Sequence, residues 1–171
     1  MNEVRVAFSS SPWLGALIKE FTGGDVNHAF FIFYDPVFDA QLTLGANANG
    51  LTIEHLDKFD GQIIHVFEPT DPSKGLEMGL RLWAHLLNEP YDFAGLVGMA
   101  AVEVARQAGI WDMENPFLSM KRLFCSEFAR KVINSSRYEV LPDLEAGSVD
   151  PAQLCEALKA LPDQFKEVIN G

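Results

Sequence analysis

The spacing of hydrophobic residues changes near Pro69, and this change constrains the fold more than any other feature of the chain. Before Pro69, apolar residues alternate with polar or small ones over short segments, a pattern typical of β-strands. After it, apolar residues recur every three or four positions, which is typical of amphipathic helices. Strands followed by helices predict an α+β fold, in which helices pack on one side of an antiparallel sheet.

The first part of the chain predicts a meander of about five strands. Aspartate, asparagine, proline and glycine residues separate the apolar segments and indicate turns between them. One helix interrupts the series after the first strand, with Ser11 as its cap and Gly23 and Gly24 at its end. The predicted strands cover residues 4–9, 26–34, 40–46, 51–56 and 62–68.

The second part predicts four helices, at residues 73–88, 92–107, 125–135 and 149–161. Asp150 followed by Pro151 is a typical start for the last of them. The sequence contains no internal repeat, low-complexity segment or linker. The 171 residues are therefore expected to form a single domain, residues 1–171.

Charge and hydropathy exclude several classes of partner. The net charge of -11 disfavours binding to nucleic acid or to an anionic membrane, because both require a basic surface. The longest apolar run, residues 93–102, is about half the ~20 residues that a membrane span needs. The first ten residues do not resemble an export signal, so we expect a cytoplasmic protein whose two cysteines are reduced.

Cys125 begins the segment CSEFARKVI, in which apolar residues follow a helical spacing. A thiol at a helix N-terminus lies beside unpaired backbone amides, which favour the thiolate and can bind an oxyanion. Cys125 is therefore a candidate nucleophile. The alternative is a small core residue, because free cysteines are among the most buried residues in proteins.

A cysteine nucleophile needs a base, and His28 is the best candidate of the four histidines. It interrupts the aromatic segment VNHAFFIFY, where a structural residue would more naturally be apolar. A buried histidine that bonds a backbone carbonyl is an equal alternative. His55 has polar neighbours and is expected at the surface, His65 fits either environment, and His85 is expected to be a packed or half-exposed helix residue.

No motif in the sequence indicates a metal or a cofactor. The histidines are widely spaced, with no HExxH or CxxC pattern, and no glycine-rich phosphate loop is present. We therefore expect no cofactor.

Five segments, taken in order, resemble the circularly permuted branch of the NlpC/P60 papain-like superfamily, which includes the YiiX-like and lecithin-retinol acyltransferase-like proteins. They are VNHAFFIF, LGANANGLTIEHLDKF, NEPYDFAGL, FCSEFARKVI and SVDPAQL, and the match covers most of the chain. The resemblance implies a permuted papain-like fold. It also implies that Cys125 is the nucleophile and His28 the general base.

The third catalytic position departs from the family pattern. The family commonly places a carboxylate on the strand after the histidine, often in a Glu-Ala pair, where this chain has Gly45 and Ala46. Regular alternation puts Gln41 and Thr43 on one face of that strand, and Asn47 follows it. We expect one of these three to orient the imidazole, for which an amide or hydroxyl suffices.

The resemblance also implies a substrate site at Tyr91 and Ser126. For Tyr91 the alternative is a partly buried tyrosine near a helix start. Glu127 is interpreted as a residue that complements the helix dipole or caps the backbone, not as a catalytic group.

These residues together predict a cysteine hydrolase that acts through a thioester on a small-molecule, peptide or lipid-like acyl substrate. Two alternatives stay open. One is a papain-like scaffold that has lost its orienting carboxylate and serves in binding or assembly. The other is an ordinary α+β core in which Cys125 and His28 lie far apart. The sequence does not determine the oligomeric state.

Overall fold

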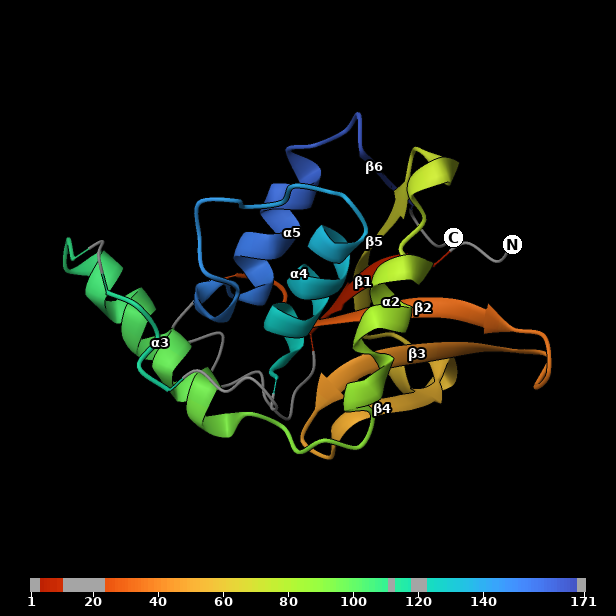
Figure 1. Ribbon diagram of the computed structural model, residues 1–171, viewed down its shortest axis with the longest axis horizontal. Coiled ribbons are helices and arrows are strands. Elements are labelled where there is room, and N and C mark those ends of the chain that lie inside the picture. The colour runs from red at the N-terminus through yellow and green to blue at the C-terminus, as the bar shows by residue number, and fades with distance from the viewer. Residues whose placement is uncertain (1–3, 11–23, 111–112, 118–122, 169–171) are drawn as a thin grey trace.

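The chain folds around a six-stranded sheet in which every pair of neighbouring strands is antiparallel (Figure 1). The computed structural model describes residues 4–10, 24–110, 113–117 and 123–168. The order of the strands across the sheet is β4-β3-β2-β1-β5-β6. They are β1 (Arg5–Ser9), β2 (His28–Asp35), β3 (Ala40–Asn47), β4 (Gly50–His55), β5 (Ile63–Pro69) and β6 (Phe165–Glu167).

The sheet confirms the antiparallel prediction but differs from it in two respects. Strand β5 pairs with β1 instead of continuing the meander after β4, because the 3-10 helix η1 (Leu56–Phe59) carries the chain across one face of the sheet. Strand β6 pairs with β5 and was not expected. It has three residues, of which Phe165 alone is apolar and buried, so its sequence has no strand pattern.

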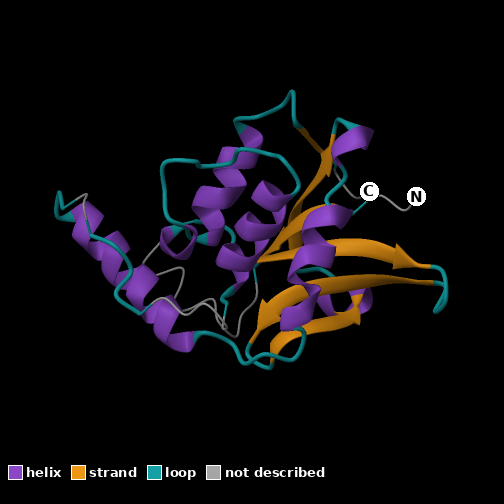
Figure 2. Cartoon of the chain, in the orientation of Figure 1, coloured by secondary structure: helices purple, strands orange, loops and turns teal. Residues whose placement is uncertain are grey.

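Four α-helices follow the first five strands in the described part of the chain (Figure 2). They are α2 (Glu77–Trp83), α3 (Phe93–Gln107), α4 (Cys125–Ser135) and α5 (Pro151–Lys159). Helix α2 is shorter than predicted, since the backbone is extended at Gly75 and the flanking turns are 3-10 helices η2 (Pro72–Lys74) and η3 (Ala84–Leu86). The helix predicted after Ser11 lies outside the described residues.

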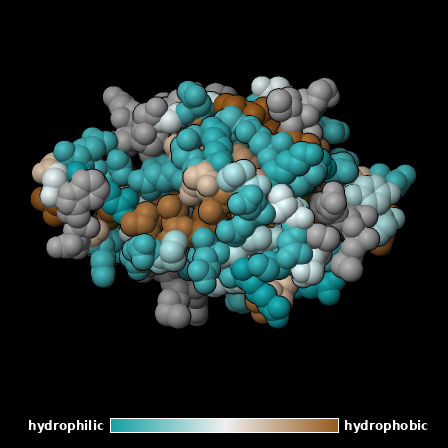
Figure 3. Space-filling view, turned by 90° about the horizontal axis from the view of Figure 1, so that it is seen from above, coloured by the Kyte–Doolittle hydropathy of each residue, from teal (hydrophilic) through white to brown (hydrophobic). Residues whose placement is uncertain are grey.

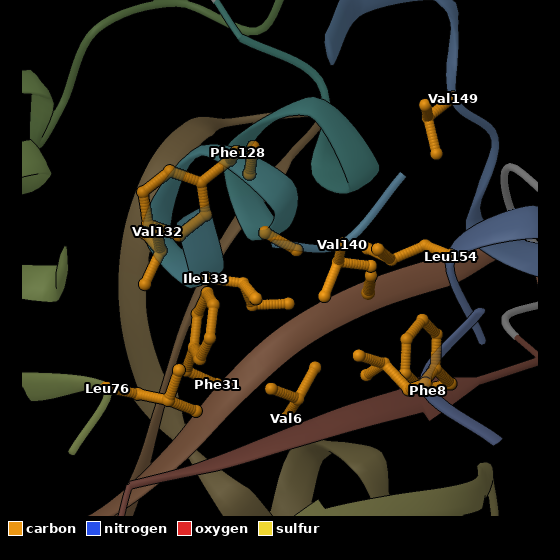
Figure 4. Packing of buried hydrophobic residues seen from close by; sticks show 14 of the residues in the cluster. Val6, Phe8, Phe31, Leu76, Phe128, Val132, Ile133, Val140, Val149 and Leu154 are labelled. Carbon is orange, nitrogen blue, oxygen red and sulfur yellow. The ribbon is translucent and has the colours of Figure 1, made fainter. Parts of the chain in front are cut away.

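The main hydrophobic core lies between one face of the sheet and the helices (Figure 4). Helix α4 is its centre, with contacts to β2, β3, α2 and α5. The rings of Phe31 on β2 and Phe128 on α4 meet edge to face at 5.7 Å. Since α4 also begins with Cys125, packing of this helix against the sheet determines where the thiol lies.

The opposite face of the sheet has a smaller core, formed by Ala7, Phe30, Ile32 and Val66. Leu56, Phe59 and Ile63 cover it. Strand β2 is therefore buried on both faces, with Ala29 and Phe31 in the main core and Phe30 in the smaller one. Alternation along β2 consequently decides which core each side chain enters.

Charged and polar residues dominate the surface seen from above in Figure 3, and apolar side chains are confined to limited areas. Within the ranges that the structure describes, no helix combines the length and the apolar character needed to cross a bilayer.

Candidate functional site

Cys125 is the first residue of α4, and its side chain is 1% exposed. Phe124 precedes it with an extended backbone, and its carbonyl accepts the first helical hydrogen bond from Phe128. Both phenylalanine rings are buried in the main core. The packing of these apolar residues therefore places the start of α4 in the protein interior.

The thiol is surrounded by groups that can donate hydrogen bonds. Burial raises the pKa of Cys125, while the backbone of Ala29, the hydroxyl of Tyr91 and the backbone at Ser126 and Cys125 itself oppose that rise. These donors are the type of group that stabilises a thiolate or an oxyanion. Burial has the larger effect, so Cys125 is a neutral thiol at pH 7 in this conformation.

Tyr91 has a buried hydroxyl beside this thiol. The side chain is 3% exposed, and burial together with Cys125 raises its pKa well above the usual value for tyrosine. The hydroxyl and the thiol are near enough to affect each other's pKa, but they lack the distance and angles of a full hydrogen bond. Among the described residues, no other atom satisfies the hydroxyl. The structure thus brings Tyr91 and Cys125 together, whereas the role of Tyr91 in substrate binding stays a prediction from the resemblance.

His28 is the first residue of β2, directly before Ala29, whose backbone is among the neighbours of the thiol. Its ring, however, stacks on Phe30 at 5.4 Å and on Phe59 at 6.0 Å, in the smaller core. Burial lowers the pKa of His28 to about 4. The backbone of His28 is thus close to the thiol, but the neutral imidazole is directed to the opposite face of the sheet from α4.

The three candidates for the orienting residue all have other partners. Gln41 accepts a bond from Arg5 Nη2 at 3.2 Å, and Thr43 donates to the carbonyl of Glu54 at 3.2 Å. Asn47 Nδ2 donates to Thr52 Oγ1 at 2.7 Å and is 3.3 Å from Glu54 Oε2. Gln41 and Thr43 share one face of β3, as the alternation predicted, and Asn47 is the last residue of β3 on that same face instead of following the strand. This is also the sheet face of His28, yet none of the three is bonded to its ring.

Two further polar residues, Ser9 and Glu54, lie on this same face and are not among the predicted site residues. Ser9 lies directly opposite His28 in the pairing of β1 with β2, and its buried hydroxyl has no partner among the described residues. Glu54 on β4 has its carboxylate on this face, where Oε1 accepts a hydrogen bond from Lys58 Nζ at 2.7 Å. The sequence predicted the orienting residue on or just after the strand that is β3. The alternation of LTIEH, combined with its pairing to β3, was the signal that could have identified Glu54.

Ser126 has a structural contact. Its hydroxyl is fully buried and donates to the carbonyl of Val149 at 2.6 Å, which fixes the segment before α5 against the start of α4. Its backbone, by contrast, is one of the groups that favour the Cys125 thiolate.

Two buried carboxylates flank the start of α4. Glu127 forms an ion pair with Lys131 at 2.7 Å, and burial raises its pKa while Lys131 opposes the rise. The backbone of Phe124 also favours the Glu127 carboxylate, in agreement with a backbone-capping role. Asp92 caps α3 through the amide of Gly95 at 3.0 Å.

The remaining histidines and the second cysteine lie elsewhere. His55 and His85 are exposed, and His65 Nδ1 lies 2.7 Å from Glu167 Oε1 across β5 and β6. Cys155 is buried in α5, where burial raises its pKa to about 12. Within the described ranges, no three His, Cys, Asp or Glu side chains converge to form a metal site.

No protein-family model matches this sequence, and no curated protein is significantly similar to it. The resemblance to the permuted papain-like proteins therefore stays a prediction based on the quoted motifs.

Proposed function

We propose that this protein is a cysteine hydrolase of the permuted papain-like type, which cleaves amides or esters through a thioester on Cys125. One observation carries the proposal: a thiol at the start of a buried helix lies among the backbone of Ala29, its own backbone and the otherwise unsatisfied hydroxyl of Tyr91. Buried polar groups without partners are rare, and those that occur often serve a ligand or a reaction.

In the proposed reaction, Cys125 Sγ attacks the carbonyl carbon of the substrate and forms a C–S bond. The thiol proton passes to His28, which returns it to the leaving amine or alcohol as the original bond breaks. The N–H of Cys125 and the hydroxyl of Tyr91 donate to the oxyanion. Water then attacks the thioester, releases the acid and restores the thiol.

The position of His28 adds one requirement to this mechanism. Its ring is stacked on Phe30 and Phe59 on the sheet face opposite α4, so it must leave this stack to receive the proton. Rotation about the Cα–Cβ bond alone keeps the ring on that face, so the backbone at the start of β2 must also change conformation. The structure then represents a resting state in which thiol and imidazole are both neutral.

A pair of matched variants tests the proposal. A panel of nitrophenyl esters and peptide anilides is screened with the wild type, Cys125→Ala and Cys155→Ala. Both cysteines are buried, so both substitutions leave a similar cavity and cost about 1 kcal/mol of stability. Turnover is expected in the wild type and in Cys155→Ala only. Equal turnover in Cys125→Ala would reject Cys125 as the nucleophile.

A specific observation favours a second candidate, a non-catalytic papain-like scaffold for binding or assembly. Both members of the proposed pair are buried and neutral, and the His28 ring stacks on Phe30 on the opposite face of the sheet from α4, the helix that begins with Cys125. This candidate predicts no turnover of any acyl substrate. It also predicts that His28→Ala leaves the alkylation rate of Cys125 unchanged.

A further inference from the structure

The segment 88–91, here called the 88–91 loop, lies between η3 and α3 and carries Tyr91 to the thiol. Two backbone hydrogen bonds attach it to Leu51, the second residue of β4. The amide of Asn88 donates to the carbonyl of Leu51 at 2.9 Å, and the amide of Leu51 donates to the carbonyl of Glu89 at 3.1 Å. The loop is therefore paired with β4 as a short extra strand would be.

Gly50 permits this attachment for two independent reasons. Its φ is +106°, a conformation that residues with a side chain rarely adopt. A Cβ at this position would also lie 2.3 Å from the carbonyl oxygen of Glu89 and 3.2 Å from its carbon. That contact is with backbone, so a larger residue at position 50 must push the loop away from the hairpin.

The other end of the loop is attached to the approach to α4. The amide of Asp92 donates to the carbonyl of Leu123 at 3.3 Å, two residues before Cys125. The Tyr91 ring packs on Phe93 with 4.9 Å between their centroids. Tyr91 thus lies between one attachment at β4 and a second at Leu123, just before the helix that carries the thiol.

We infer that Gly50 is a positioning residue of the candidate site: its lack of a side chain lets the 88–91 loop lie against the hairpin and so holds the Tyr91 hydroxyl at Cys125. The inference rests on the proposed function for its relevance to catalysis. Its test needs no acyl substrate, because the position of the hydroxyl changes the acidity of the thiol.

The test measures the pH profile of Cys125 alkylation by iodoacetamide, followed by peptide mass spectrometry, in Gly50→Ala, Tyr91→Phe and the double variant. Removal of a hydroxyl that favours the thiolate is expected to slow alkylation about fivefold at a fixed pH below the thiol pKa. Gly50→Ala should show a similar loss, and the double variant should lose no more than either single variant. Losses that multiply in the double variant would overturn the inference. So would faster alkylation in Gly50→Ala, because the loop would then only shield the thiol.

Gly109→Ala is the matched control. Gly109 also has a positive φ, of +83°, but a Cβ there would meet nothing within 4 Å. It should carry a similar backbone strain and leave the Cys125 profile unchanged. An equal change in Gly109→Ala would show that general destabilisation, not the loop, alters the thiol.

A second pair of variants decides the matter if Gly50→Ala does not fold. Asn88 has a φ of +68°, which glycine adopts freely and alanine does not. Asn88→Ala should therefore loosen the loop and reproduce the Tyr91→Phe profile, while Asn88→Gly should retain that of the wild type. Wild-type behaviour of Asn88→Ala would overturn the inference. Turnover in Cys125→Ala, in contrast, would reject the proposed function. The alkylation profiles would still test whether Gly50 positions the Tyr91 hydroxyl.

Discussion

The imidazole of His28 lies nearly parallel to the ring of Phe59, with 12° between their planes and 6.0 Å between their centroids. Phe30 stacks on the same imidazole, and the rings of Phe30 and Phe59 are themselves 4.3 Å apart. A charged imidazolium is poorly solvated in this apolar stack, which is why burial lowers the pKa of His28 to about 4.

The stability of the protein should therefore fall as the pH is lowered from 6.5 to 4. The unfolded chain binds a proton at His28 in this range and the folded chain does not, so the stability that is fully present above pH 6.5 is lost as the pH falls through the folded pKa. The difference between 6.5 and about 4 corresponds to about 3 kcal/mol, at 1.36 kcal/mol per pKa unit.

Urea unfolding of the wild type and His28→Phe at several pH values measures this contribution, because phenylalanine keeps the stack and removes the titration. All other titrating groups are common to both proteins and cancel. His55→Gln, at an exposed position, is the control and should behave as the wild type. If wild type and His28→Phe lose stability in parallel, the histidine is protonated in the folded state and the stacked, neutral arrangement is wrong.

Because the pKa of Cys125 is raised, we expect iodoacetamide to alkylate this thiol slowly at neutral pH. Cys125 and Cys155 should both react with iodoacetamide more slowly than a free thiol, whose pKa is about 8.5, and both rates should increase with pH above that value. In 8 M urea the two thiols should react alike. Rapid labelling of folded Cys125 near pH 6 would contradict the neutral resting state and indicate a thiolate–imidazolium pair.

The sequence predicted the parts of the site that depend on local pattern. Alternation located β2, and helical spacing placed Cys125 at the first turn of α4. Alternation also put His28 on the strand face of Phe30, as the structure shows. Whether that face packs against α4 was not predictable, because β2 is buried on both sides and both faces are aromatic. The backbone of Ala29 beside the thiol could not be predicted either, since backbone groups leave no signal in a sequence. The contacts of Gly50 with the 88–91 loop depend on tertiary packing alone.

Tyr91→Phe should make the protein more stable and less active. The buried hydroxyl has no full hydrogen bond among the described residues, so its removal should raise the free energy of unfolding by about 1 kcal/mol. Loss of an oxyanion donor should lower kcat by about 100-fold with little change in KM. Thermal unfolding and steady-state kinetics on any ester found in the screen provide the two measurements. Lower stability together with unchanged kcat would assign Tyr91 to the core alone.

Packing of α2 against α4 depends on the absence of a side chain at Gly79. A Cβ there would lie 2.1 Å from the carbonyl oxygen of Val132 and 2.5 Å from Ser136 Oγ, which also accepts a bond from the Gly79 amide at 3.1 Å. Gly79→Ala must therefore separate the two helices, because the backbone of α4 cannot give way without disturbing the main core. The expected loss is about 3 kcal/mol, at the upper end of the range for overpacking.

Gly75→Ala is the control for this change, because a Cβ at Gly75 would meet nothing within 4 Å and its φ of -55° suits alanine. Chemical denaturation should show near wild-type stability for Gly75→Ala and a large loss for Gly79→Ala. Since α4 carries Cys125 at its opposite end, a folded Gly79→Ala protein should also show a changed alkylation rate at Cys125 if the helix moves as a rigid unit. A wild-type unfolding curve for Gly79→Ala would show that α2 does not pack on α4 in solution at the distance described.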